Sequence, residues 1–264
     1  MTEPLEAAAV LLVLLGSSVL GLIVQPYLSD RHRSRETMDL VRLVVAMLVT
    51  FTALVLGMLT TSGKSSFDKI DSGMKSFAAA LIQLDQSLRQ YGSETEPARG
   101  QLRSYTAAVI ASTWVDEAKP AGNYYPQDLP QGMSESVVLG NKLARVGLMI
   151  RQLEPQDAMH RQLAADCIQQ FDQLVQGRWQ LIEDGGDGVI SAPFAAVVLF
   201  WLAIVFASFG LNAPRNLLAG VTIALAAISI ASVIYLILDL DSPFSGVIAV
   251  QSQAMRGALA HLSR

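Results

Sequence analysis

The chain has 264 residues, of which only 16% are charged and 52% are hydrophobic, and its formal net charge is −4 at pH 7. A soluble domain usually carries about 25% charged residues, so this composition favours a membrane protein, and the negative charge gives no basic surface for nucleic acid. Cys167 is the single cysteine, which excludes an intrachain disulfide and a cysteine metal cluster.

Four hydrophobic segments without a charged residue form two pairs, at 7–28 and 43–63 and at 188–214 and 216–238. A helix rises about 1.5 Å per residue, so about 20 apolar residues cross a hydrocarbon core of about 30 Å. We therefore predict an all-α integral membrane protein with four transmembrane helices in two hairpins, in contact with the lipid bilayer. An acidic stretch precedes the first segment, so we expect a retained helix rather than a cleaved signal peptide.

The two pairs bracket a polar middle, for which we predict an inserted extramembrane antiparallel helical bundle. The expected parts are a transmembrane hairpin at 1–63, the helical domain at 64–187, a second transmembrane hairpin at 188–240 and an amphipathic tail at 241–264. The second hairpin is expected to span the membrane at about 190–212 and 216–238. The tail carries Ile248, Met255, Leu259 and Leu262 among few charges, which is typical of a surface or re-entrant membrane helix.

Basic residues cluster in the short connections between the paired segments, with Arg31, Arg33, Arg35 and Arg42 in the first connection and Arg215 in the second. By the positive-inside rule, both short turns face the cytoplasm. The helical domain and both termini are then periplasmic or extracellular. The opposite orientation is supported by three lysines that follow the second segment, Lys64, Lys69 and Lys75.

After the second segment, apolar residues recur three and four positions apart for more than three heptads: Phe67, Ile70, Met74, Phe77, Leu81, Leu84, Leu88 and Tyr91. This spacing predicts a stalk helix over about 64–91 that packs lengthwise against another helix. We expect the stalk to continue the second segment without a break. Its weak points are Gly63 and Gly73, because each glycine costs a helix about 1 kcal/mol relative to alanine.

A second helix of the middle domain is expected after Gly92. Ser93 and Glu96 have the spacing of a capping box, which predicts a helix that starts there and reaches Trp114. Its predicted apolar face consists of Leu102, Tyr105, Val109 and Ile110. Residues 115–134 follow, and their prolines and glycines predict the longest irregular stretch of the chain.

Two more helices complete the predicted bundle, one at about 135–153 and one from Pro155 to the glycines at 185–186. The apolar residues of the last helix are Met159, Leu163, Phe171 and Leu174. Cys167 follows the same helical pattern, and we interpret it as a small packed core residue. Helices joined by short links in this way favour an antiparallel bundle.

Two aspartates, Asp239 and Asp241, lie where the fourth hydrophobic segment ends. Ionisable residues at membrane depth often mark ion paths, so one hypothesis is a ring of carboxylates at the mouth of an oligomeric pore. The interpretation that we favour is that both aspartates lie among the lipid head groups and end the helix. They follow the apolar run and do not interrupt it.

Asn212, Arg215 and Asn216 form a second polar cluster, in the turn that joins the third and fourth segments. Arg215 fits a topology anchor, and the alternative is a cation that attracts anions to a pore entrance. The fourth segment also carries small residues, which let membrane helices approach closely within one chain or between chains. These residues are Gly220, Ala224, Ala227, Ala231 and Ser232.

No catalytic signature is visible in the sequence. His32, His160 and His261 lie far apart, and none has a partner at a metal-ligand spacing. The sequence has no glycine-rich phosphate loop and no G-x-S-x-G elbow. We therefore expect neither an enzyme nor a cofactor or metal site. A membrane enzyme would require scattered polar residues that come together only on folding.

Four stretches carry a more specific pattern: TTSGKSSFD at 60–68, LDQSLRQYG at 84–92, FWLAIVFASFGLNAPRN at 200–216 and LILDLDSPFSG at 236–246. Together they resemble the bacterial bestrophin-like family over nearly the whole chain. The resemblance implies a multi-pass protein of the bacterial inner membrane. Kinship with bestrophins, which are pentameric anion channels, implies a channel, although the stacked aromatic neck of a bestrophin pore has no match here.

Two functions remain open at this point. The first is a homo-oligomeric channel or channel-like pore for small ions, because four spans leave little room for a transport path inside one protomer. The second is a membrane-anchored sensor or scaffold whose outer helical bundle binds a partner or signal.

Overall fold

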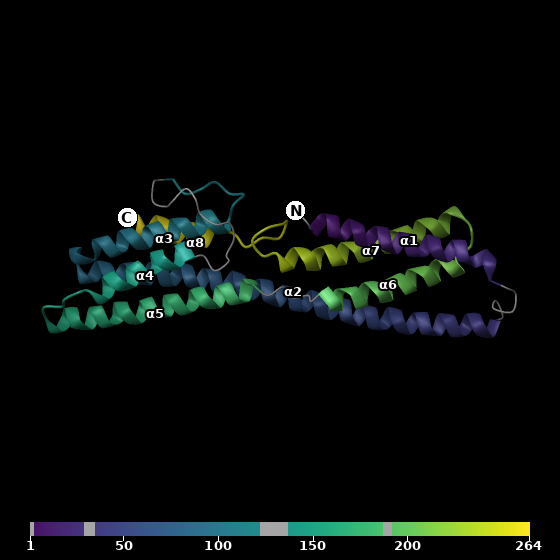
Figure 1. Ribbon diagram of the computed structural model, residues 1–264, viewed down its shortest axis with the longest axis horizontal. Helices are drawn as coiled ribbons and strands as arrows, with labels where there is room; N and C mark the ends of the chain where they lie inside the picture. Colours follow the sequence, from purple (N-terminus) through teal and green to yellow (C-terminus); the bar gives the residue numbers. More distant parts are fainter. Residues whose placement is uncertain (1–2, 29–34, 122–136, 187–191) are drawn as a thin grey trace. The chain divides into compact units, whose positions relative to one another are not determined.

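The computed structural model describes residues 3–28, 35–121, 137–186 and 192–264, and regular structure in these ranges is helical throughout (Figure 1). The α-helices are α1 (Glu3–Val24), α2 (Arg35–Tyr91), α3 (Glu96–Thr113), α4 (Val137–Arg151), α5 (Ala158–Gly186), α6 (Ala192–Asn212), α7 (Leu217–Asp241) and α8 (Gln253–Leu262). Two 3₁₀ turns, η1 (Gln25–Tyr27) and η3 (Ser93–Thr95), follow α1 and α2. The predicted all-α class is confirmed.

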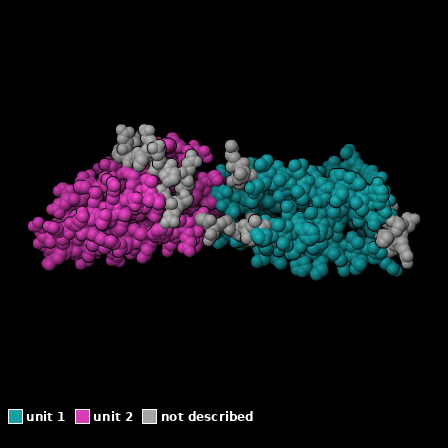
Figure 2. All heavy atoms as spheres, viewed as in Figure 1, with its two compact units in different colours: residues 1–66, 188–242, 246–248 teal, residues 67–187, 243–245, 249–264 magenta. Residues whose placement is uncertain are grey.

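The chain divides into two compact units, coloured separately in Figure 2. Unit 1 comprises residues 1–66, 188–242 and 246–248, and unit 2 comprises 67–187, 243–245 and 249–264. Four helices, α1, α2, α6 and α7, are long and apolar enough to cross a membrane. The prediction of four transmembrane helices is therefore confirmed.

The core of unit 1 joins α1, α6 and α7 with part of α2. Its buried side chains are Leu14, Leu56, Val198, Leu202, Phe206, Ala227 and Ile237. Outside this core the same helices carry exposed apolar residues, such as Leu12, Phe200 and Leu225. A helix that is apolar on all sides is suited to lipid, so the outer surface of unit 1 fits a hydrocarbon environment.

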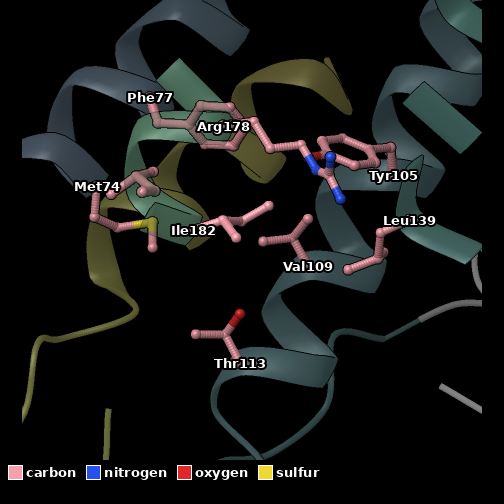
Figure 3. Close-up of a pocket in the computed structure, with 9 residues that line it drawn as sticks. Met74, Phe77, Tyr105, Val109, Thr113, Leu139, Arg178 and Ile182 are labelled. Atoms are coloured by element: carbon pink, nitrogen blue, oxygen red, sulfur yellow. The ribbon is translucent and has the colours of Figure 1, made fainter. Parts of the chain in front are cut away.

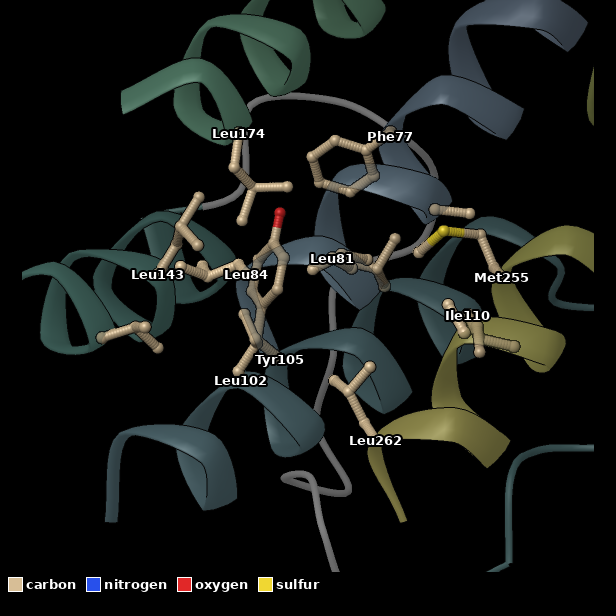
Figure 4. Close-up of a cluster of buried hydrophobic side chains, with 14 of the residues drawn as sticks. Phe77, Leu81, Leu84, Leu102, Tyr105, Ile110, Leu143, Leu174, Met255 and Leu262 are labelled. Atoms are coloured by element: carbon tan, nitrogen blue, oxygen red, sulfur yellow. The ribbon is translucent and has the colours of Figure 1, made fainter. Parts of the chain in front are cut away.

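Unit 2 is built on the heptad seam of α2, and Figure 4 shows part of its core. Seven of the eight seam residues, from Ile70 to Tyr91, are at most 4% exposed, and Phe67 packs against them from the edge. The seam prediction is thereby confirmed. Burial of apolar side chains contributes about 25 cal/mol per Å², so the buried seam stabilises the unit.

Helices α3, α4 and α5 cover the seam with their own apolar faces. The buried residues are Leu102, Tyr105, Val109 and Ile110 of α3, Leu139, Leu143, Val146 and Ile150 of α4, and Cys167, Phe171, Leu174 and Leu181 of α5. The packed position predicted for Cys167 is confirmed. Met159, which the sequence places among the apolar residues of this helix, is instead 71% exposed.

Helix α2 runs without interruption from Arg35 to Tyr91, through both glycines that were expected to weaken it. A Cβ on Gly63 would lie 3.6 Å from Cβ of Leu240, and a Cβ on Gly73 would lie 3.0 Å from Cδ2 of Leu181. The space at Gly63 would admit a methyl group at ordinary contact distance, whereas at Gly73 the Leu181 side chain would have to shift. The expected continuous helix is confirmed.

The start of α3 differs from the predicted capping box. Ser93 begins the 3₁₀ turn η3, and α3 itself begins at Glu96 without a side-chain cap on its N-terminal amides. The hydroxyl of Thr95 donates instead to the carbonyl oxygens of Leu88, at 2.5 Å, and Gly92, at 2.8 Å. Thr95, in the short link between α2 and α3, thus bonds back to the end of α2 in place of a capping box at the start of α3. The prediction that Ser93 forms a capping box is wrong.

The tail after α7 also differs from its prediction. Met255, Ala258 and Leu262 of α8 are buried in the core of unit 2. The indole Nε1 of Trp114 donates to the carbonyl oxygen of Val250 at 2.7 Å, which holds the segment that leads into α8. The apolar face of the tail is thus occupied within unit 2, and the expected surface or re-entrant membrane helix is not what the structure shows.

Some predictions fall on parts of the chain outside the described residues. These are the connection with Arg31, His32 and Arg33, most of the irregular stretch 115–134, and the start of the third hydrophobic segment at 188–191.

Candidate functional site

The membrane part of α2 has a face that no other described part of its chain covers. Only 11% of its most apolar stretch is buried, against 17–28% in the other three spans. Exposed residues recur along this face every three or four positions: Leu43, Met47, Thr50, Leu54, Gly57 and Thr61. We call this set the α2 stripe.

The opposite face of α2 is the one that packs within unit 1. Thr52 and Leu56 are buried there, and Leu59 and Gly63 continue the same side. The threonines of the α2 stripe bond to their own helix: Thr50 Oγ1 donates to Ala46 O and Thr61 Oγ1 to Gly57 O, both at 2.9 Å. The α2 stripe is therefore apolar with small and hydroxyl residues interspersed, and it carries no charge between residues 43 and 61.

Asp239 lies in the last turn of α7 and is only 1% exposed. Its Oδ1 accepts a hydrogen bond from Val247 N at 3.0 Å, and its Oδ2 accepts one from Ile248 N at 2.8 Å. Two amide donors on one carboxylate make strong, charge-assisted bonds that hold the segment after α7. The carboxylate is thus engaged by its own chain, and a role at a pore mouth stays a prediction.

Gly246 permits this arrangement. Its φ of +92° lies in the left-handed region, and a Cβ there would lie 2.2 Å from Oδ1 of Asp239. Only glycine combines this backbone conformation with so close an approach.

Asp241 lies two residues further on and is half-buried. It lines a cavity of about 420 Å³ in unit 1, together with Glu6 of α1 and apolar side chains of α1, α2, α6 and α7. Cavities of roughly 300–1,000 Å³ are typical of ligand pockets. Glu6 and Asp241 are the acidic side chains among its described lining residues.

The polar turn between α6 and α7 is held by local bonds. Asn216 caps α7, since its Oδ1 accepts from Ala219 N at 2.8 Å, and Asn212 Nδ2 donates to Ser208 O at 2.8 Å. Arg215 is exposed beside them. Gln25 Nε2 reaches the turn from η1 and donates to Ala213 O at 3.2 Å. The structure therefore brings Asn212, Arg215 and Asn216 together in one turn, and their function at a pore entrance stays a prediction.

The sequence pattern did not single out the glycines that matter most in unit 1. Gly220 of the predicted small-residue face has nothing within 4 Å of its Cβ position, whereas Gly21 and Gly210 meet the backbone of another helix. A signal was present, because Ser18 and Gly21 of α1, like Ala207 and Gly210 of α6, are small residues three positions apart.

His160 has local partners, whereas Nδ1 of His261 is buried without a hydrogen-bond partner among the described residues. His160 Nδ1 lies 2.8 Å from Asp157 Oδ2, and its ring stands edge-on to Tyr91 at 5.2 Å. Within the described ranges no group of three or more histidine, cysteine, aspartate or glutamate residues is arranged to hold a metal ion.

Comparison with known proteins identifies the architecture. The family model described as the bestrophin-like domain matches residues 12–255. The chain belongs to the bestrophin-like family. Among curated proteins none matches this bestrophin-like sequence.

Solved structures show the same fold. A variant of a bacterial bestrophin homologue from Klebsiella pneumoniae matches with a TM-score of 0.65 and 14% identity, over 99% of this chain and 97% of that one. A second variant matches with a TM-score of 0.63 and 14% identity, over 98% and 100%. The structure of the same homologue phased with zinc matches with a TM-score of 0.63 and 13% identity, over 97% and 96%. At this identity the likeness establishes the fold of the bestrophin-like chain.

Proposed function

We propose that this bestrophin-like protein is a homo-oligomeric membrane channel for small ions, with anions as the first candidates, and that the α2 stripe lines its pore. The observation that carries the proposal is the uncovered face of α2. A membrane helix with so little support in its own chain is stabilised by contact with further helices, which copies of the same chain would supply. Membership of the bestrophin-like family supports the same arrangement.

The α2 stripe has the composition expected of such a path. It is uncharged from residue 43 to residue 61, so any ion that passes meets apolar, glycine and hydroxyl surface, which is how hydrophobic constrictions gate by dewetting. Charged or polar residues at helix ends, Asp241 at one and Arg215 at the other, would bias which ions reach it. Asp239, Asn212 and Asn216 would shape these ends mainly through the backbone bonds that they make.

Cysteine modification in liposomes tests the proposal. In a Cys167→Ala background, Thr61→Cys places one thiol on the α2 stripe, and a charged thiol reagent is expected to reduce ion flux. Thr222→Cys on α7 is a matched control, because Thr222 is also exposed and also donates to the carbonyl four residues earlier at 2.9 Å. Block by modification at both positions, or a pure oligomer without flux under varied voltage and pH, argues against the proposal.

The orientation of the chain is a second part of the proposal. Both short turns face the cytoplasm if the arginines of the connections decide the topology, and unit 2 and the termini then lie outside. Two reporters fused after Arg264 measure the side on which the C-terminus lies. One fluoresces only in the cytoplasm, and the other is active only in the periplasm. Cytoplasmic fluorescence would reverse the orientation.

A further inference from the structure

Arg178 is a buried cation in the core of unit 2. It comes from α5, is 8% exposed, and points with its guanidinium toward the hydroxyl end of Tyr105 (Figure 3). Tyr105 is itself 1% exposed. Burial raises the pKa of Tyr105, and the neighbouring guanidinium opposes that rise without ionising the phenol at neutral pH. Arginine stays charged at all ordinary pH values, so a full positive charge lies in this core.

The described residues do not neutralise this charge. Within them, no carboxylate lies within 4 Å of Arg178, whereas buried Asp85 of the same unit has two arginine partners. The ring of Trp179 lies 5.4 Å from Arg178 Cζ and offers a cation–π contact. Such a contact contributes much less than the cost of burying an unpaired charge, which proteins avoid by pairing or neutralisation.

A small cavity adjoins the guanidinium. Its volume is about 20 Å³, and its lining comes from α2, α3, α4 and α5. By this measure roughly 10–15 Å³ admits one water molecule, so there is room for a single small species. The polar side chains of the lining are Arg178, Tyr105 and Thr113, and the rest are apolar.

The polar lining consists of hydrogen-bond donors without a side-chain acceptor of opposite charge. A guanidinium has only N–H donors, and both hydroxyls have a proton to donate. Thr113 Oγ1 is buried with no hydrogen-bond partner in the described structure. A water molecule would accept hydrogen bonds from such groups but would leave the charge of Arg178 uncompensated. A small anion both accepts hydrogen bonds and supplies the opposite charge.

We propose that the cavity beside Arg178 and Tyr105 in unit 2 binds one small monovalent anion of the halide class, with the Arg178 guanidinium as its counter-charge and the Tyr105 hydroxyl as a donor. Thr113 lies further along the same lining and is its third polar side chain. The site belongs to the core of unit 2, whereas the α2 stripe belongs to unit 1, and the proposal does not depend on whether the protein conducts ions.

Thermal unfolding of the purified full-length protein tests the site. Sodium chloride replaces sodium gluconate at constant ionic strength, so that screening stays the same. A ligand that binds only the folded state raises the Tm as its concentration increases. We expect the Tm of the wild type to rise with chloride and bromide. Arg178→Gln should remove that dependence, and Tyr105→Phe should weaken it.

Arg151→Gln is the matched control. Arg151 lies on α4 of the same unit, is 57% exposed at its side chain, and pairs with Asp172 at 3.2 Å. This variant should retain the full chloride dependence. If Arg151→Gln loses it as well, or if the wild type has none, the inference is wrong.

Bromide provides a second measurement that does not require a folded Arg178 variant. Crystals of the wild type grown in bromide should show an anomalous peak within hydrogen-bond distance of the Arg178 guanidinium. A carboxylate side chain in that position, or a density without anomalous signal, would overturn the assignment and leave a water site or an internal ion pair.

Discussion

Gly21 of α1 and Gly210 of α6 bring the backbones of two membrane helices into direct contact. A Cβ on Gly21 would lie 2.1 Å from the carbonyl oxygen of Ala207, and a Cβ on Gly210 would lie 1.9 Å from that of Ser18. Neither distance leaves room for a side chain, so the contact exists because both positions lack one. In lipid, such close packing is a principal source of helix association.

Replacement of either glycine by alanine should weaken unit 1. In Gly21→Ala or Gly210→Ala the new methyl group meets backbone atoms that cannot rotate away, so the helices must separate. Overpacking of this kind costs about 1–3 kcal/mol, and more where the backbone is the obstacle. We expect a clearly lower Tm in detergent, measured by circular dichroism.

Gly16→Ala is the control for these variants. Gly16 lies on the same helix α1, and nothing is within 4 Å of its Cβ position. A surface change away from any contact is expected within about 0.5 kcal/mol of the wild type. A loss of Tm as large as that of Gly21→Ala would contradict the packing explanation, because alanine favours a helix over glycine and the new methyl group at position 16 meets no neighbour.

The elements that could be predicted from the sequence are those governed by local spacing. The seam from Phe67 to Tyr91 repeats with a helical period, and the apolar segments have the length of a membrane. Both signals depend on neighbours within a few residues, so no knowledge of the fold is needed to interpret them. The apolar run predicted a fourth span that ends at residue 238, whereas α7 continues to Asp241. Hydrophobicity marks the part of a helix that suits the membrane, and the helix itself can extend beyond it.

The features that escaped prediction depend on contacts between distant segments. Asp239 is buried because a turn with a positive φ at Gly246 carries two amides back to it, and composition alone favours a carboxylate among lipid head groups. The amphipathic pattern of α8 suits a membrane surface as well as a protein core, and only the fold shows that Met255 is in the core of unit 2. Arg178 and Tyr105 are 73 positions apart, and their proximity has no local signal.

The anchor at Asp239 gives a second prediction. Asp239→Ala leaves the amides of Val247 and Ile248 without their acceptor, and hydrogen bonds to a charged group contribute about 1.5–3 kcal/mol each. Gly246→Ala should produce a similar loss, because its methyl group would strike Oδ1 in a strained backbone conformation. The measurement is the Tm of each variant and of the double variant.

The double variant decides whether the two residues act together. If Asp239 and Gly246 serve one contact, their effects are much less than additive, since removing either one already breaks the turn. Additive losses would indicate that Gly246 acts through some other contact.

Cys167 predicts a pH dependence of stability. Burial raises the pKa of its thiol from 9.0 to about 11, and the nearby Asp166 adds to the shift. A thiol that holds its proton more tightly when folded contributes fully below pH 9, and this contribution is lost as the pH rises from about 9 to about 11. The loss is on the order of 3 kcal/mol, from about 1.4 kcal/mol for each of the two pKa units.

The measurement is the Tm at several pH values between 8 and 11 for the wild type and Cys167→Ala. The variant is less stable at every pH because it leaves a cavity, but its decline above pH 9 should be shallower than that of the wild type. Parallel declines would assign the pH dependence to lysines and tyrosines. Thiol reagents at pH 8 should react with Cys167 only after unfolding, since the group is fully buried and protonated.

The buried carboxylate of Asp85 gives the fourth prediction. It is 0% exposed and accepts from Arg89 Nε at 2.7 Å and from Arg99 Nε at 2.8 Å, which ties α2 to α3. Arg89 also donates to the carbonyl oxygen of His261 at 3.0 Å, so the same group holds the end of α8. Asp85→Asn keeps the shape and removes the charge, and breaking a buried pair costs about 3–5 kcal/mol. Both arginines retain some exposure, so we expect the lower end of that range.

Asp71→Asn is the matched control on the same helix. Asp71 pairs with Lys75 at 2.7 Å one turn away, and the lysine side chain is 66% exposed. Such a surface pair contributes about 0.3–0.5 kcal/mol, so the control should unfold close to the wild type in a denaturant titration. Limited proteolysis adds a readout specific to the network. If Asp85 positions Arg89 against His261, Asp85→Asn exposes the α8 segment to cleavage before the rest of unit 2, whereas equal cleavage in both variants would confine Asp85 to the α2–α3 contact.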